Sequence, residues 1–221
     1  DGGRVLVGAR GNDGSGNNVG QAQLFDAATG ALLQTFHDPN PTNEDRFGSA
    51  VAIGAGGLLV GAPNDDTAGS NVGEVYQFSP TTGALIRTFN DPTPTTNDQF
   101  GGAIAISGGR ALIGAGGDDS DGLNTGQAHL FDLTTGALLQ TFHNPLPNAS
   151  DLFGLSLALD GDRALIGAAF DDGNGLNVGQ AYLFDVTTGA LLQTYDDPTP
   201  TSADHFGVAV ALEGDNVLIG A

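Results

Sequence analysis

The residues best suited to chemistry in this sequence are acidic and amide side chains in a loop that recurs four times. The copies read NDGSGNNVG over residues 12–20, DDTAGSNVG over 65–73, DDSDGLNTG over 118–126 and DDGNGLNVG over 171–179. Carboxylates, a sharp glycine turn and an amide supply oxygen ligands of the kind that a hard cation takes, with backbone carbonyls completing the shell. We therefore predict Ca²⁺ (calcium) ligands, and no other cofactor, at Asp13, Asn18, Asp65, Asp66, Asn71, Asp118, Asp119, Asn124, Asp171, Asp172 and Asn177.

A second interpretation of the same loops is purely structural. Asp and Asn side chains in turns bond to nearby backbone N–H groups and so fix the loop. Both interpretations stay open at the level of the sequence. Both place the four loops on one rim, because each loop holds the same place in its repeat. If a cation binds, it is expected near Asp66, Asp119 or Asp172.

The loops belong to a repeat with a fixed period. Phe-Gly pairs begin at Phe47, Phe100, Phe153 and Phe206, which are 53 residues apart each time, and such a period predicts a repeat architecture. We expect one repeat domain over 1–221. It divides into an incomplete unit over 1–46, full units over 47–99, 100–152 and 153–205, and the start of a further unit over 206–221.

Each unit reads as four short strands and a connector. Residues 47–53 and 58–62 are rich in small and β-branched side chains and suit buried inner strands. Residues 73–78 form the third strand, and 84–89 carry a polar residue mid-strand, as expected of an outer strand. The two prolines of 90–99 forbid ladder pairing, so this connector is a crossover.

This pattern predicts an all-β fold. Four antiparallel strands per unit, with small inner strands and a polar outer strand, describe the blades of a β-propeller or a segment of a larger propeller or array. The four phenylalanines of the Phe-Gly pairs are expected to lie buried between blades, and Phe36 on an outer strand to matter less. The position shared by Gln23, Tyr76, His129 and Tyr182 varies and is expected to be exposed.

The run from Phe47-Gly48 to Gly61-Ala62-Pro63, with alternating apolar residues and a turn between, resembles the FG-GAP repeat. The resemblance implies the β-propeller of integrin α chains and of many bacterial surface proteins. In the integrin-like version, a calcium loop lies between the first and second strands. Residues 54–57 here read GAGG, which is too short and too poor in carboxylates for that site. The family's calcium site is therefore not expected here.

Composition narrows the function. Six basic residues face 26 acidic ones, giving a net charge of −20, and such a surface repels nucleic acid. No apolar run reaches the ~20 residues of a membrane span. The sequence shows no nucleophile motif and no asymmetric carboxylate pair, so no enzyme is predicted. We expect an extracellular or cell-surface structural or adhesive propeller that binds its own copies or other surface proteins. The alternative is a calcium-dependent, lectin-like head that binds glycans.

Overall fold

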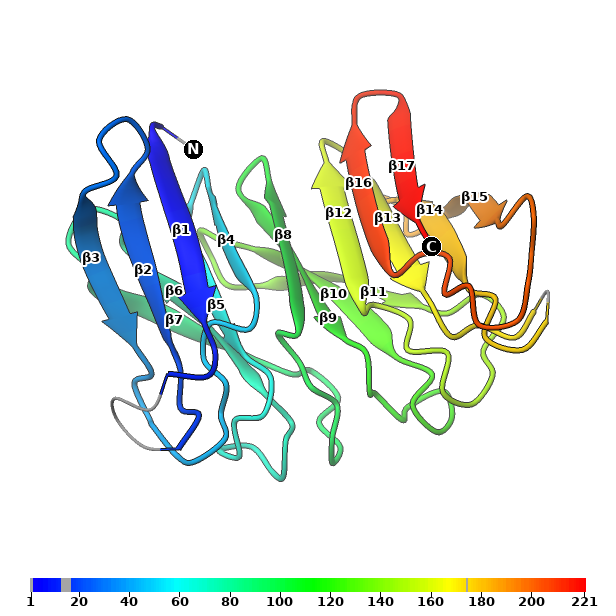
Figure 1. The fold of residues 1–221 in the computed structure, drawn as a ribbon, viewed down its shortest axis with the longest axis horizontal. Helices are drawn as coiled ribbons and strands as arrows, with labels where there is room; N and C mark the ends of the chain where they lie inside the picture. Colours follow the sequence, from blue (N-terminus) through cyan, green and yellow to red (C-terminus); the bar gives the residue numbers. More distant parts are fainter. Residues whose placement is uncertain (1, 13–16, 174) are drawn as a thin grey trace.

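The computed structural model of the protein describes residues 2–12, 17–173 and 175–221. In this part of the chain, strands β1 to β17 form five antiparallel sheets that stand side by side (Figure 1). The sheets do not close into a ring. The all-β prediction is thus confirmed, with several four-stranded sheets of the kind that form propeller blades. Each sheet is called a blade below.

The second blade shows how the sequence produces each sheet. Its order is β4 (Val51–Gly54), β5 (Gly57–Ala62), β6 (Glu74–Phe78) and β7 (Leu85–Asn90), each strand pairing with the next along the chain. The two middle strands are buried at every position, which suits their small and β-branched side chains. The outer strand β7 begins with exposed residues. The inner strand therefore faces its counterparts in neighbouring blades, and the outer strand faces solvent.

The other blades repeat this order, in full or in part. The first holds β1 (Arg4–Ala9), β2 (Gln21–Asp26) and β3 (Leu32–His37). The third holds β8 (Ala103–Ser107), β9 (Arg110–Ala115), β10 (Gln127–Asp132) and β11 (Leu138–His143), and the fourth holds β12 (Ser156–Asp160), β13 (Arg163–Ala168), β14 (Gln180–Asp185) and β15 (Leu191–Asp196). The fifth is the hairpin of β16 (Ala209–Glu213) and β17 (Asn216–Gly220). Strands β1 and β17 thus each pair within their own sheet.

Glycines set the distance between blades. The glycine of each Phe-Gly pair has a positive φ, for example 90° at Gly101, and its N–H donates to the second strand of its own blade at Gly114 O, 2.9 Å away. Its carbonyl lies against Gly61 of the preceding blade, where a Cβ would overlap it. The same overlap arises between Gly114 and Gly154. Any larger residue would push the blades apart, so glycine is required on both sides.

Aromatic rings fill the space between blades. Phe100 is fully buried and meets Phe131 of the third blade edge-on, with ring centroids 6.1 Å apart. Phe89 at the end of the second blade packs on the same Phe131 at 5.1 Å. Phe47 and Phe153 are also fully buried, which confirms the expectation for three of the four Phe-Gly pairs, whereas Phe206 is only half-buried.

The prediction that Phe36 matters less was wrong. Its strand β3 is an outer strand, but Phe36 itself is buried and packs on Phe78 of the next blade at 5.1 Å. The reason is that only the first half of each outer strand projects into solvent. Its second half turns toward the crossover, so its phenylalanine enters the next seam.

A β-bulge recurs between the third and fourth strands of the first four blades. In the third blade, Leu130 pairs with Gln140 and Phe131 pairs with Leu138, which leaves Leu139 without a partner position. The equivalent extra residues are Leu33, Ile86 and Leu192. A bulge of this kind bends the strand and changes the direction of a side chain.

We predict that Phe100→Ala lowers the free energy of unfolding by about 3–5 kcal/mol, because it leaves a cavity at a seam between two blades. Phe36→Ala should cost a similar amount. Denaturant unfolding followed by circular dichroism measures both. Leu123→Ala is the control: Leu123 is 62% exposed, so its loss should change stability by less than about 0.5 kcal/mol. Equal values for Phe100→Ala and Leu123→Ala would contradict the packing described.

Candidate functional site: acidic clusters between the blades

The described parts of the four Asp-rich loops lie on the same side of the array. Each joins a second strand to a third strand, and the second strands all run in the same direction (Figure 1). Each loop bonds to the crossover that follows it; in the second blade, Gln99 N donates to Asn71 O at 3.1 Å. The loops remain on separate blades and do not converge on one centre. Asp13, one of the predicted ligands, lies outside the described residues.

Three of the loops contain two adjacent aspartates, and the two differ in burial. The first of each pair is buried, and the second is exposed. The buried ones are Asp65, Asp118 and Asp171, and the exposed ones are Asp66, Asp119 and Asp172. Two side chains in such different surroundings play different parts, although the sequence presents them as a pair.

The exposed carboxylates bond to their own loops. Asp66 Oδ1 accepts from Asn71 N at 2.7 Å, and Asp119 Oδ1 accepts from Asn124 N at 2.6 Å. The recurrent asparagine is explained by its backbone, since Asn71 has a φ of 50°, a left-handed conformation that Asn tolerates well. Asn18, Asn124 and Asn177 have the same conformation. These contacts are those of the structural interpretation; calcium binding near these residues stays a prediction.

The buried carboxylates join a second group of residues, supplied by the crossover. In the first inter-blade cluster, Asp65 lies with Asp38 and Asp45, and one ligand atom from each lies within 4.8 Å of the others. Asp38 follows β3, and Asp45 ends the crossover two residues before Phe47. Asp65 Oδ2 accepts from the hydroxyl of Tyr76 at 2.8 Å. Residues from two blades and their connector thus meet in one buried place.

The same arrangement recurs between the next blades. The second inter-blade cluster contains Asp91, Asp98, Asp118 and His129, and the third contains Asn144, Asp151, Asp171 and Tyr182. In the third, Asp151 Oδ2 accepts from Asn144 Nδ2 at 2.7 Å. The aspartate that stands two residues before each Phe-Gly pair also accepts from a backbone N–H of the crossover; for Asp151 the donor is Asn148 N at 2.6 Å.

The sequence prediction failed for one member of each cluster. The position shared by Tyr76, His129 and Tyr182 was expected to be exposed, but all three side chains are fully buried. These residues stand on the third strand of each blade, which pairs with a strand on both edges and has neighbouring blades packed against its faces. A side chain at this position is therefore buried. A useful signal was present: in each full unit a polar aromatic or imidazole ring stands at this position, 11 residues after the buried Asp, as Tyr76 does after Asp65.

Burial governs the charge of the clusters. Burial, together with the neighbouring charges of Asp45 and Asp65, raises the pKa of Asp38 to about 7. Burial likewise raises the pKa of Asp91 to about 6 and that of Asp151 to about 6. Conversely, burial lowers the pKa of His129 to about 4, so its imidazole is neutral at pH 7. The clusters are sites where negative charge is costly.

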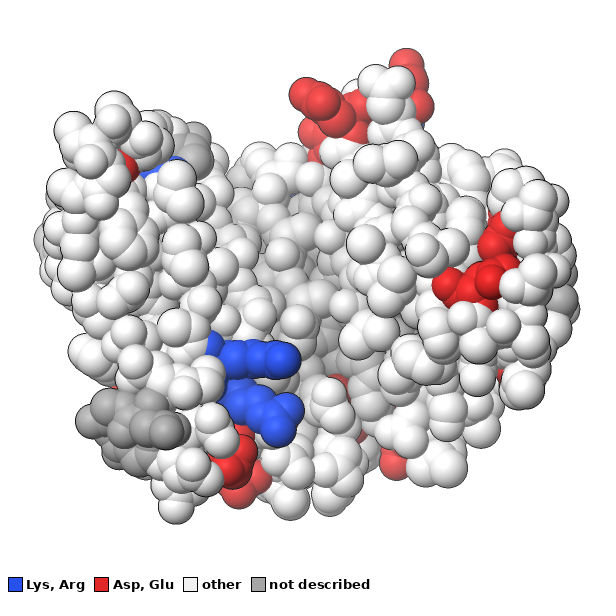
Figure 2. Space-filling model, in the orientation of Figure 1, with Lys and Arg blue, Asp and Glu red and all other residues white. Residues whose placement is uncertain are grey.

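These clusters hold a large part of the acidic residues. Of the 26 acidic residues of the chain, nine in the described part are buried, and all of these except Glu74 belong to the three clusters. On the face drawn in Figure 2, the remaining charges stand in a few separate groups on a mostly uncharged surface. The six arginines are all half-buried or exposed. Buried carboxylates without a paired arginine are stabilised by hydrogen-bond donors, by a bound proton or by a metal ion; the last two are the kinds of chemistry open to the clusters.

The fold defines a class: this is an all-β repeat protein whose four-stranded antiparallel sheets, joined by fixed crossovers, are consistent with the blades of a propeller. A family model described as the FG-GAP repeat matches residues 34–78, 93–131 and 147–184, more than half of the chain. The chain therefore belongs to the FG-GAP repeat family. A comparison with curated proteins gives no match. No helix in residues 2–12, 17–173 and 175–221 is long and apolar enough to span a membrane.

Asp38→Asn tests the cost of the buried charge, since Asn144 stands at the same place in the third cluster. The folded state holds a proton on Asp38 up to about pH 7, whereas the unfolded chain releases it near the ordinary aspartate pKa of 3.8. Wild-type stability from this group therefore falls as the pH rises from about 4 to 7. We expect the variant to be more stable at pH 8 by about 1–2 kcal/mol and nearly unchanged at pH 4.

Denaturant unfolding in EDTA at both pH values measures the difference. Asp26→Asn is the matched control, because hydrogen bonds from Thr29 lower the pKa of that exposed carboxyl. Its loss should destabilise the protein at pH 8, the opposite sign. A destabilising effect of Asp38→Asn at pH 8 would show that the carboxylate is favourable in its charged form.

Proposed function

We propose that this chain is a non-catalytic structural or adhesive module of an extracellular or cell-surface protein, and that it binds other proteins, including its own copies. FG-GAP repeats are typical of integrin-like protein-interaction domains, are generally non-catalytic and usually occur in extracellular or surface proteins. Family membership supports the class of function but names no surface. The outer strands supply a candidate surface.

The observation that carries the proposal is a pair of exposed apolar residues at the start of every outer strand. In the third blade these are Leu138 and Leu139, which are 44% and 47% exposed. The other pairs are Leu32 and Leu33, Leu85 and Ile86, and Leu191 and Leu192, and all of them are 43–53% exposed. Single exposed leucines are ordinary on protein surfaces, whereas a pair repeated in four successive blades forms a regular apolar surface.

The β-bulge explains how this surface arises. The second residue of each pair is the extra residue of the bulge, so its side chain is not held against the third strand. The bulge also interrupts the regular ladder at the edge of the sheet, which disfavours pairing with a strand of another molecule. We infer that a partner binds through apolar side chains that dock on these residues, rather than by adding a strand.

Removing one pair tests the proposal. We expect the wild-type chain to associate with itself in sedimentation velocity, and Leu138→Ser with Leu139→Ser to weaken that association by about 10-fold, since two half-exposed leucines lose about 1–2 kcal/mol of apolar burial. Leu123→Ser, a single exposed leucine in a loop, is the control and should leave the association unchanged. All these side chains are exposed, so melting temperatures should agree.

Two results would contradict the proposal. One is a wild-type chain that stays monomeric at high concentration. The other is an association that the outer-strand variant and the loop variant weaken equally. That result would indicate nonspecific apolar association and not a defined binding surface.

A further inference from the structure

The second inter-blade cluster differs from the other two because it contains an imidazole. Asp91 Oδ1 lies 3.9 Å from His129 Nε2, and ligand atoms of Asp91, Asp118 and His129 all lie within 4.8 Å of one another. All three side chains are at least nine-tenths buried, with exposures of 5%, 0% and 0%. Asp91 comes from the end of the second blade, and the other two come from the third.

Two buried polar atoms in the second inter-blade cluster make no hydrogen bond with the described residues. Among the described residues, neither Asp91 Oδ2 nor His129 Nε2 has a hydrogen-bond partner. A buried polar atom without a partner is costly, and native proteins rarely tolerate one. In the other clusters the matching tyrosine hydroxyl donates to the buried Asp, as Tyr182 does to Asp171 at 2.9 Å. His129 has no hydroxyl group to make this hydrogen bond, and its Nε2 has no partner in its place.

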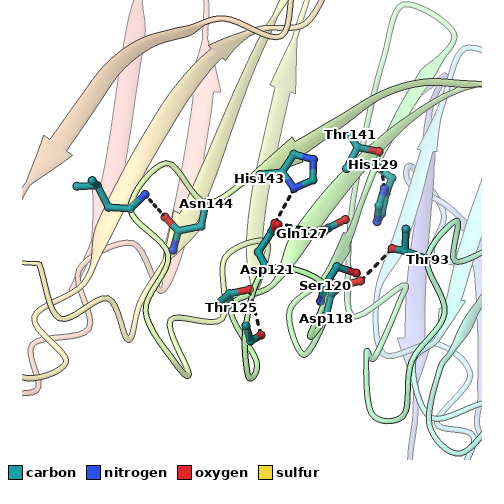
Figure 3. Close-up of polar contacts among 12 residues, drawn as sticks. Thr93, Asp118, Ser120, Asp121, Thr125, Gln127, His129, Thr141, His143 and Asn144 are labelled. Carbon is teal, nitrogen blue, oxygen red and sulfur yellow. Dashed lines mark hydrogen bonds and ion pairs between the residues drawn. The ribbon is translucent and has the colours of Figure 1, made fainter.

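Neighbouring residues hold the three side chains in place. His129 Nδ1 lies 3.1 Å from the hydroxyl of Thr141, and Thr93 donates from its hydroxyl to Asp118 Oδ2 at 3.1 Å. Figure 3 shows His129 between Thr141 on one side and the pair of Thr93 and Asp118 on the other. With Nδ1 as the donor to Thr141, Nε2 presents its lone pair to the carboxylates. This is how a metal-binding histidine is usually oriented.

We propose that Asp91, Asp118 and His129 bind a divalent transition-metal ion of the Zn²⁺ class at the seam between the second and third blades. One imidazole and two carboxylates are ligands that such ions accept, whereas Ca²⁺ takes oxygen ligands alone. At metal–ligand distances of about 2.0–2.2 Å, ligands of one tetrahedral ion stand roughly 3.3–3.6 Å apart, so small side-chain movements bring this set together.

A fourth ligand is available on the same strand. Gln127 stands two residues before His129 on β10, so both side chains point to the same face of the sheet. It is buried, and its Oε1 has no hydrogen-bond partner among the described residues. The equivalent Gln180 Oε1 accepts from the hydroxyl of Tyr182 at 2.5 Å, which shows that this amide reaches the position of the ring two residues on.

Other blades supply the variants that test the site. His129→Tyr introduces the residue that the second and fourth blades carry at this place, and His129→Gln introduces that of the first blade, so both replacements suit the fold. His143→Gln is the matched control. His143 is exposed, and its Nδ1 lies 2.6 Å from Asp121 Oδ2. Removing it shows how much of any measured Zn²⁺ binding comes from this surface pair. Tyr76→His tests the reverse change, because Asp38 and Asp65 already stand beside that ring.

The experiment is a titration of chelator-treated protein with ZnCl₂ by calorimetry, with CoCl₂ as a spectroscopic probe of coordination. We expect one tight equivalent in the wild type, unchanged in His143→Gln and weakened at least ~100-fold in His129→Tyr and His129→Gln. Zn²⁺ should raise the melting temperature of the wild type but not of these two variants. Tyr76→His should gain a second equivalent.

Three results would overturn the proposal. These are a wild type that binds no tight equivalent of Zn²⁺, tight binding that His129→Tyr and His129→Gln leave intact, and binding that His143→Gln removes. The last would assign the ion to the exposed pair of His143 and Asp121.

Discussion

Between each pair of blades, a glycine of one second strand lies against the carbonyl of the next Phe-Gly glycine. Because neither residue has a side chain, the two backbones touch directly, and this contact fixes how far apart the sheets stand. The seam that results is wide enough for three phenylalanine rings, such as those of Phe89, Phe100 and Phe131. The crossover is drawn into the same seam, since the Phe-Gly pair follows it directly in the chain. The ring contacts and the acidic clusters between blades both depend on the spacing that these glycines set.

Drawing the crossover into the seam has an electrostatic consequence. Its acidic residues arrive next to the buried Asp of the following loop, so charges that lie apart in the sequence are concentrated in a dry place. The clusters are partly neutralised by hydrogen bonds from threonine, tyrosine and asparagine side chains. The same buried carboxylates therefore fix the position of the crossover through their hydrogen bonds and lower the stability of the fold through their buried charge. A site of this kind suits a protein that must hold its blades in one register more than it must be maximally stable.

Regular features of the repeat could be predicted from the sequence. The period, the strand order, the role of the proline-rich crossover and the burial of the Phe-Gly phenylalanines follow from local patterns, because each depends on residues close in the chain. Features that depend on the neighbouring blade could not be predicted. Burial of Tyr76 and Phe36, and the meeting of Asp38 with Asp65, depend on how one sheet packs on the next. The two adjacent carboxylates of each loop look equivalent in sequence, and only packing separates them.

The tyrosine or histidine at the buried ring position also bears on how such a protein can change over time. Codons for these two amino acids differ in a single base, and the rest of each cluster is already assembled by the repeat. One point mutation in any copy of the gene segment can therefore exchange a hydroxyl for an imidazole at the heart of a seam. Gene duplication of the 53-residue unit multiplies these positions. Under the proposed Zn²⁺ site, a lineage can thus acquire or discard a metal-binding seam blade by blade, without redesigning the fold.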